Sequence, residues 1–298
     1  MEPIDYVWGL PEVQKAFQKQ QANGSWKHPN KETVTYPSYH YSLVQTWKTY
    51  RELVEHYQVT RAHEGARKAC EFLFSCQTFQ GDIRGMLANQ YATYYTGAML
   101  AILIKSGYAD DSRVNKGLEW LLSMRQNDGG WTVPILTYKL SRKTIYDLTS
   151  KYALPLDPDR SKPFSHNATD MVLRGFAVHP KYRRCEEALK AADLLKSRFF
   201  LPDSYTSYKA ASYWVRFYFW WPNIVTALDS LSLMGYSRDD PDIEKALNWL
   251  VENQLPDGLW KMDYAEGKED AFVTNEKTKE RRLWLALTIA RIFKKFYR

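Results

Sequence analysis

His166 and Asp170 carry the residue types of general acid–base catalysis. They are one helical turn apart, so on a helix their side chains lie on the same face. A carboxyl group beside an imidazole could give or take a proton if both were shielded from water. The plainer interpretation is a helix start, where a negative charge and a capping side chain are common. Asp229 offers a second carboxyl group, and both interpretations stay open at this point.

A second set of candidate residues is aromatic, and aromatic residues make up 15% of the chain. Aromatic faces attract cations, so a dry cavity that they line suits chemistry through a carbocation. The residues that we expect to line such a cavity, each close to a predicted helix start, are His40, Tyr91, Tyr94, Trp221 and Trp284. The alternative is that these rings fill an ordinary core.

Charged and metal-binding groups narrow the chemistry further. A planar guanidinium group matches phosphate oxygens, and the arginines expected to hold a diphosphate are Arg216, Arg281 and Arg282. His40 and His166 could share a metal ion, but two ligands without a third do not make a site, so we expect no metal and no other cofactor. The three cysteines have no CxxC spacing, which argues against a disulfide framework or structural zinc.

The elements that position these residues repeat along the chain. In the segments 13–26, 118–131 and 247–260, a helical pattern ends in Gln and is followed by a turn with Gly and then by Trp. Weaker copies occupy 72–83 and 194–205. Copies recur about every fifty residues, which accommodates two helices and two loops. The longest interval holds an insertion at about 134–163, of which 139–151 is predicted to be helical.

Each of these helices has a partner helix. We expect outer helices at about 6–20, 60–77, 111–126, 180–199 and 240–254, and inner helices at about 40–57, 90–107, 166–178, 219–235 and 278–297. Asp110-Asp111 and Asp239-Asp240 are typical of the N-caps of outer helices. Because an unpaired helix at each end would expose an apolar face, we expect the last helix to pack beside the first. The prediction is an all-α, closed (α/α)5–6 toroid.

The Gln–Gly–Trp turns resemble the QW repeats of squalene cyclases and of the β-subunits of protein prenyltransferases, over nearly the whole chain. The length is similar to that of small single-toroid bacterial and archaeal members. The resemblance implies that the glutamines bridge helix ends and the tryptophans cover them, namely Gln21, Gln126, Gln254, Trp26, Trp131 and Trp260. The sequence lacks the DxDD and DCTAE segments of the cyclases and the Asp-x-Cys zinc pair of the prenyltransferases.

Composition sets the remaining limits. The 298 residues contain 45% apolar residues and no Pro/Gly/Ser-rich linker, so one domain is expected over 1–298. The net charge of +7 is spread along the chain without a nucleic-acid motif, so we expect no nucleic-acid partner. The acidic N-terminus lacks a signal region, and the apolar stretches are too short to cross a bilayer. A cytoplasmic protein is expected, and contact with a membrane surface stays open.

These features leave the function open between enzyme and binding protein. The first interpretation is a protein that binds, cyclises or transfers an isoprenoid, with Asp170 as the acid and Asp229 as a second candidate. The second is a non-catalytic toroid that binds a lipid or peptide. The third is a carbohydrate enzyme, which would need two carboxylates at the mouth of the barrel. The sequence does not indicate an oligomeric state.

Overall fold

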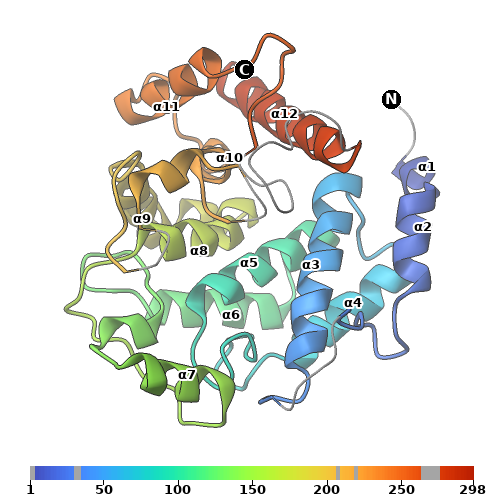
Figure 1. Ribbon diagram of the computed structural model, residues 1–298, viewed down its shortest axis with the longest axis vertical. Coiled ribbons are helices and arrows are strands. Elements are labelled where there is room, and N and C mark those ends of the chain that lie inside the picture. Colours follow the sequence, from blue (N-terminus) through green and yellow to red (C-terminus); the bar gives the residue numbers. More distant parts are fainter. Residues whose placement is uncertain (1–3, 30–34, 206–208, 218–220, 263–275) are drawn as a thin grey trace.

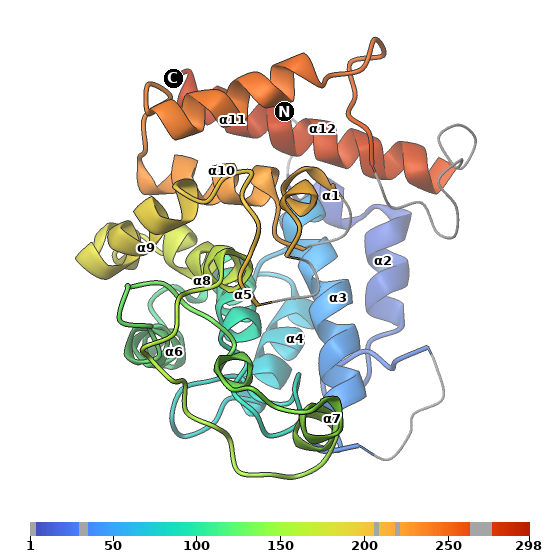
Figure 2. The same ribbon diagram turned by 60° about the vertical axis from the view of Figure 1, so that its left-hand side comes forward.

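The computed structural model describes residues 4–29, 35–205, 209–217, 221–262 and 276–298. Within these ranges the named elements are helices, as the sequence predicts (Figures 1 and 2). In chain order they are α1 (Ile4–Trp8), α2 (Pro11–Gln18), α3 (His40–Tyr57), α4 (Glu64–Ser75), α5 (Thr93–Leu103), α6 (Ser112–Ser123), α7 (Arg142–Ser150), α8 (His166–Val178), α9 (Glu186–Lys196), α10 (Ile224–Met234), α11 (Pro241–Glu252) and α12 (Glu276–Phe296). Shorter turns are η1 (Ile104–Tyr108), η2 (Pro134–Thr137), η3 (Tyr182–Arg184) and η4 (Ala211–Val215).

The helices divide into an inner and an outer set by their burial. Nearly every described side chain of α5 and α8 is buried, and most of α10 is buried too. In contrast, α4, α6 and α11 bury one face and leave the other in water. A helix that is covered on all sides lies inside a protein, whereas a one-sided helix covers a core. For these six helices the inner and outer positions follow the prediction, and the fold is a helical α/α toroid. In contrast, α12, predicted to be an inner helix, buries only Ile289, Ile292 and Phe296 of its described side chains.

Two inner helices approach each other closely because both carry glycine at the contact. A Cβ atom on Gly97 of α5 would lie 2.5 Å from Cα of Val172, and one on Gly175 of α8 would lie 2.9 Å from the carbonyl oxygen of Gly97. No side chain fits in either place, so the two backbones are in contact. This contact fixes the positions of the neighbouring residues on α5 and α8.

The tryptophans of the repeats tie outer helices to inner ones. The indole N–H of Trp131 donates to the carbonyl of Leu121 at 2.6 Å, and its backbone N–H donates to Oγ1 of Thr169 on α8 at 2.9 Å. Trp26 makes the same pair of contacts with the Ala16 carbonyl and Thr46. The structural role predicted for the tryptophans is confirmed.

The first repeat corrects the prediction in one respect, because the bridging amide belongs to Gln20 rather than Gln21. Gln20 Nε2 donates to the carbonyls of Gly24 at 2.9 Å and Gly65 at 2.8 Å. The side chain of Gln21 instead accepts a hydrogen bond from Ser25. The acidic caps are as predicted, since Asp111 caps α6 and Asp240 caps α11.

The insertion at about 134–163 is held to the main ring along its returning segment. It contains η2 and α7, and α7 is the additional helix predicted at 139–151. No residue of α7 is buried. The returning segment is held by side chains of the main ring: Asn89 Nδ2 and Gln90 Nε2 donate to the carbonyls of Ala153 at 2.9 Å and Leu154 at 3.0 Å.

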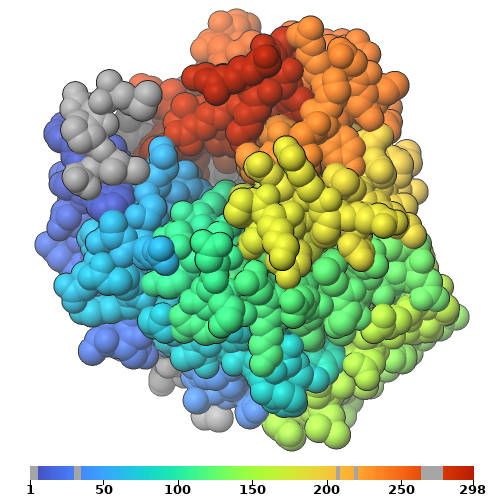
Figure 3. Space-filling model, turned by 180° about the vertical axis from the view of Figure 1, so that it is seen from behind, coloured from blue at the N-terminus to red at the C-terminus, as the bar shows by residue number. Residues whose placement is uncertain are grey.

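The last helix meets the start of the ring in a different place from the one predicted. α12 packs along α10, and its Trp284 ring stacks on His56 of α3 at 4.3 Å between ring centroids. The contact is therefore with the first inner helix, α3, and the prediction that α12 lies along the first helix is wrong. Seen from behind, α12 crosses the top of the molecule (Figure 3). Among the described residues, no helix combines the length and apolar character needed to span a membrane.

Candidate functional site

An apolar cavity of about 350 Å³ lies where α5 and α8 begin and where the chain enters α10. The insertion supplies part of its wall, from η2 and from Ile145 and Thr149 of α7. Tyr94 and Trp221, both predicted from the sequence, line it. The full lining is Leu87, Tyr94, Val133, Ile135, Leu136, Ile145, Thr149, Ser165, Asn167, Ala168, Tyr205 and Trp221. A largely apolar hollow with a few polar groups is the usual form of a small-molecule site.

The aromatic side chains on one side of this cavity contact one another in a row. Tyr94 and Trp221 meet edge-on at 6.5 Å between ring centroids, and Tyr94 lies 4.4 Å from Tyr95. Burial raises the pKa of Tyr94 well above its ordinary value, so its hydroxyl group stays neutral at any physiological pH. The cavity thus presents neutral aromatic surface, which is compatible with a hydrocarbon or a cation.

Asp170 lies one turn further along α8 than the lining residues Asn167 and Ala168, and it is fully buried. Its Oδ2 accepts a hydrogen bond from Thr226 Oγ1 at 2.7 Å and one from the Arg174 guanidinium at 3.0 Å. Its Oδ1 is buried and has no partner. Burial raises the pKa of Asp170, and the hydrogen bonds and the charge of Arg174 oppose that rise without cancelling it.

His166 is buried at the first position of α8 and stacks on Trp214 at 4.4 Å between ring centroids. Its Nδ1 has no hydrogen-bond partner and lies 3.7 Å from Oδ2 of Asp203. That carboxylate is occupied by Ser165 Oγ at 2.7 Å and by the backbone N–H of Asn167 at 2.9 Å. Burial lowers the pKa of His166 to about 4, so the imidazole is neutral at pH 7. A neutral imidazole of this kind is a weak proton donor.

Other predicted residues lie outside the cavity. Asp229 forms an ion pair with Lys295 at 2.7 Å and is about one-third exposed. The Nδ1 of His40 lies 2.7 Å from the Gly85 carbonyl. The Tyr91 hydroxyl donates to Gln80 at 3.3 Å, and its ring lies 4.8 Å from the Arg84 guanidinium. In the described part of the chain no three metal-ligating side chains come together, and His40 and His166 are therefore not part of such a group.

The three arginines proposed for a diphosphate have separate surroundings. Arg216 lies over the Tyr213 ring at 4.6 Å. Arg282 pairs with Asp257 at 2.8 Å and donates to the Trp260 carbonyl, while Arg281 is exposed. Trp284 stacks on His56 and does not line the cavity. These residues therefore do not converge on one ligand group in this structure.

Another group of charges, which the sequence analysis missed, lies on the inner helices. Glu55 of α3 pairs with Arg51 at 3.0 Å, and Lys105 of η1 lies 4.0 Å away. The charges of Arg51, Lys105 and Arg174 together lower the pKa of Glu55, although burial acts strongly in the opposite direction. Glu55 nevertheless keeps 31% of its side-chain surface accessible.

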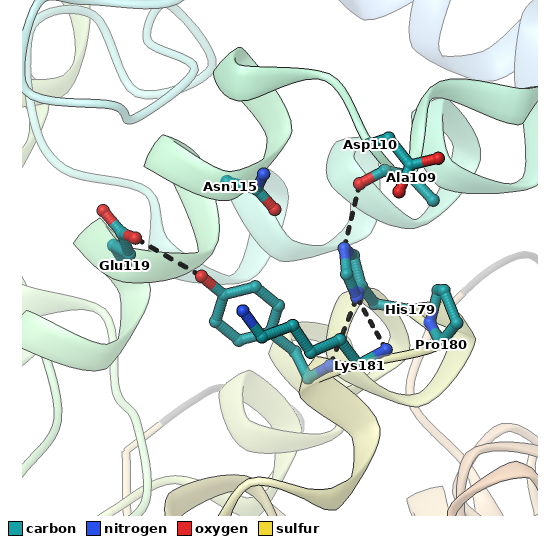
Figure 4. A pocket seen from close by; sticks show the side chains of 8 residues that line it. Ala109, Asp110, Asn115, Glu119, His179, Pro180 and Lys181 are labelled. Atoms are coloured by element: carbon teal, nitrogen blue, oxygen red, sulfur yellow. Dashed lines mark hydrogen bonds between the residues drawn. The ribbon is translucent and has the colours of Figure 1, made fainter.

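A larger, polar depression of about 520 Å³ lies elsewhere, beside α6 and the end of α8 (Figure 4). His179 bridges its floor: Nε2 lies 2.9 Å from the Ala109 carbonyl, and Nδ1 accepts from the backbone N–H groups of Lys181 and Tyr182. The Tyr182 hydroxyl donates to Glu119 at 3.4 Å. Because His179, Tyr182 and Glu119 already hydrogen-bond to one another or to the backbone, we choose the smaller apolar cavity as the candidate ligand site.

The cavity residues missed by the sequence analysis come from the insertion and from the decayed repeat. Ile135, Leu136, Ile145 and Thr149 belong to the first group, and Tyr205 to the second. Ile145 and Thr149 are spaced i, i+4 on a predicted helix, so they share a face. This i, i+4 spacing is the sequence feature that could have indicated a helix with one face toward the site.

Comparison with known proteins supports the fold. No family model matches the chain. A squalene–hopene cyclase from Bradyrhizobium diazoefficiens is 27% identical over 165 residues, which cover 53% of this chain and 22% of that enzyme. The matched region thus spans about a fifth of that relative.

Solved structures of one enzyme show the same fold over nearly the whole chain. The type II terpene cyclase MstE from Scytonema, without ligand, has a TM-score of 0.57 at 14% identity and covers 97% of this chain and 73% of that one. An arginine-to-alanine variant of MstE with geranylgeranyl dihydroxybenzoate has a TM-score of 0.54 at 15% identity, covering 97% of this chain and 72% of that one. The fold is squalene-cyclase-like, as the repeats predicted.

Proposed function

We propose that the protein binds an isoprenoid in the apolar cavity and that Asp170 protonates it to start cyclisation. The observation that carries the proposal is a fully buried carboxyl group one helical turn behind an aromatic, apolar cavity. The rise along α8 from Asn167 to Asp170 is about 4.5 Å at 1.5 Å per residue. The terpene-cyclase-like fold and the substrate complex of MstE support an isoprenoid as the ligand.

The surroundings of Asp170 give each oxygen a separate task. Thr226 and Arg174 donate to Oδ2, so the proton of the neutral acid occupies the unpartnered Oδ1. Transfer of that proton to a double bond or epoxide uses its π electrons or ring-oxygen lone pair and leaves a carbocation. The next double bond attacks this cation, a carbon–carbon bond forms, and loss of a proton ends the sequence. The carboxylate that remains is stabilised by Arg174 and Thr226.

His166 and Asp229 fit the role of proton donor less well than the sequence suggested. With its pKa near 4, His166 cannot supply the proton at pH 7. Asp229 is held by Lys295. We therefore assign the acid to Asp170 alone, with Tyr94 and Trp221 as the aromatic wall. His40, Tyr91, Trp284 and the three arginines named above stay untested predictions.

Two alternatives remain as outcomes of the same experiment. The ion pair between Asp170 and Arg174, with donor and acceptor 3.0 Å apart, favours the carboxylate, and a permanently ionised Asp170 would leave a binding protein without an acid. A carbohydrate enzyme would need Asp170 and Asp229 as its two carboxylates, yet each is paired with a cation.

The test compares wild type, Asp170→Asn and, as a control, Asp239→Asn, a residue in an exposed turn. Each is incubated with a geranylgeranyl substrate, squalene and oligosaccharides, and products are identified by mass spectrometry. We expect cyclised prenyl products from wild type and the control, and a rate at least about 100-fold lower for Asp170→Asn. Binding without turnover would leave a binding protein, and cleavage of oligosaccharides would point to the carbohydrate alternative.

We also propose a cytoplasmic location with peripheral contact to a membrane surface. Leu283 and Leu287 of α12 are exposed at i, i+4 spacing, and the exposed Arg291 and Lys294 follow them on the same helix. Apolar and basic side chains on one helix suit an anionic lipid surface. Co-sedimentation with anionic but not neutral vesicles is expected, and equal recovery with both would contradict the proposal.

A further inference from the structure

The inner helices carry two chemically different zones. The cavity end is aromatic, with Tyr94 and Trp221. Further along the helices lies the Arg51–Glu55–Lys105 cluster, with Arg174 near it. On α8 every residue is buried except Arg174 and Val178, which are spaced i, i+4. Arg174 and Val178 are thus the two residues of α8 that keep some accessible surface.

A continuous row of ring contacts connects the two zones. Tyr94 of the cavity lies 4.4 Å from Tyr95, and Tyr95 meets Trp47 edge-on at 6.5 Å. The Arg51 guanidinium then lies over the Trp47 ring at 5.9 Å. Along α8, the rise from Ala168 at the cavity to Arg174 is about 9 Å at 1.5 Å per residue. The two zones therefore lie within roughly 10 Å of each other along α8.

We propose that the ligand is an amphiphile: its isoprenoid tail fills the aromatic cavity and its anionic head group, a carboxylate or a phosphate, binds at Arg51 and Lys105 near Arg174. This inference rests on the proposed function and specifies the substrate class of the same site. A neutral hydrocarbon such as squalene would leave the charged zone without a counterpart. The MstE complex holds a geranylgeranyl chain on a dihydroxybenzoate, and that ligand belongs to the same chemical class.

The charges of the cluster support an anion there. Glu55 is shared by Arg51 and Lys105, so one carboxylate serves two cations. Arg51 keeps a buried Nε–H group without a partner, although its Nη1 is used by Glu55. A buried donor left unpaired is costly. An incoming carboxylate or phosphate oxygen would accept from such a guanidinium with a short, charge-assisted hydrogen bond.

The experiment measures binding of four probes of equal tail length by calorimetry: farnesol, farnesoic acid, farnesyl phosphate and farnesyl diphosphate. Proteins are wild type, Arg51→Gln, Lys105→Gln and the control Lys68→Gln, which removes one positive charge from an exposed pair on α4. We expect wild type to bind one or more of the anionic probes at least about tenfold more tightly than farnesol, because each charge-assisted hydrogen bond is worth about a factor of ten. Lys105→Gln and Arg51→Gln should each remove most of that preference, and Lys68→Gln should keep it.

The outcomes separate this inference from the proposed function. Equal binding of farnesol and the anionic probes would overturn the head-group site and leave the isoprenoid cavity standing. A preference that survives in both cluster variants would place the head group elsewhere, which also overturns the inference. No binding of any probe would defeat the proposed function itself. Lys105 is about one-third exposed, so its variant should fold even if Arg51→Gln does not, and thermal melts check this.

Discussion

Thr169 and Asp170 are neighbours in sequence but serve different regions of the molecule. Thr169 accepts the backbone N–H of Trp131, so one face of α8 belongs to the structural turn of the repeat. Asp170 faces Thr226 and Arg174, with one oxygen left unpartnered. Trp131 uses both of its N–H donors, whereas Asp170 and His166 each keep a buried polar atom without a hydrogen bond.

Thr169 and Asp170 show that one helix, α8, serves both the structural turn of the repeat and the candidate site. Buried polar groups in folded proteins are nearly always satisfied, so an unsatisfied one needs an explanation, and a catalytic role is one explanation. The turn around Trp131 contributes stability and should have no direct effect on a ligand. The Asp170 region should do the reverse. Single variants distinguish these two roles by their effects on the free energy of unfolding and on ligand affinity.

Trp131→Ala should lower the free energy of unfolding by about 3–5 kcal/mol, because the side chain is completely buried and leaves a cavity. Urea denaturation measures the loss. Isoprenoid affinity of the remaining folded fraction should stay within about twofold of wild type, because Trp131 does not line the cavity. A variant that kept its stability but lost its affinity would reverse the two roles assigned to the faces of α8.

The fold was predictable because it depends on a local pattern that recurs. Each copy of the Gln–Gly–Trp turn follows an amphipathic helix, and even the weak copy ending at Ile83 keeps the backbone contact, with Ile83 N–H donating to Thr96 Oγ1 at 3.2 Å. The choice between Gln20 and Gln21 was not predictable, since both amides stand next to the turn. Only the direction in which the chain leaves α2 decides between them.

The site was predictable only in part, because its residues come together across the ring. Tyr94 and Trp221 could be found, since they stand at helix starts. Ile145 of the insertion could not be placed, because its i, i+4 spacing with Thr149 indicates a shared helix face but not where that helix folds back. Arg51 and Glu55 were missed for a similar reason: an i, i+4 ion pair is typical of a solvated surface, and here it occurs on an inner helix.

His166 should make the protein sensitive to acid. Its pKa is about 4 in the folded protein, below its ordinary value of 6.5, so protonation favours unfolding. The associated stability is fully present above pH 6.5 and is lost as the pH falls towards 4, by at most roughly 3 kcal/mol. His166→Gln should flatten the pH dependence of the unfolding free energy over that window. His56, whose pKa is also lowered to about 4, is present in both proteins and cancels in the comparison.

A matched variant sharpens this test. His56→Gln removes a second imidazole whose pKa is lowered to about 4, and this imidazole stacks on Trp284. Each single variant should reduce the pH dependence of the unfolding free energy between pH 6.5 and 4, and the double variant should combine the two reductions. If His166→Gln keeps the wild-type slope between pH 6.5 and 4, its imidazole is not held neutral by burial.

Asp170→Asn should change stability least and in the opposite pH direction. Burial raises the pKa of Asp170, so the folded protein binds a proton more tightly than the unfolded chain does. Wild type should therefore lose stability as the pH rises from about 4, the ordinary range of an aspartate, through the raised pKa of Asp170, and the asparagine variant should not. At pH 7 the variant should be within about 1 kcal/mol of wild type, because it loses the attraction between Asp170 and Arg174 as well as the cost of a buried charge. Chemical denaturation at a series of pH values checks the slope. A wild-type stability that rises with pH relative to the variant would show that the ion pair dominates, and Asp170 would then belong with Thr169 among the structural residues of α8.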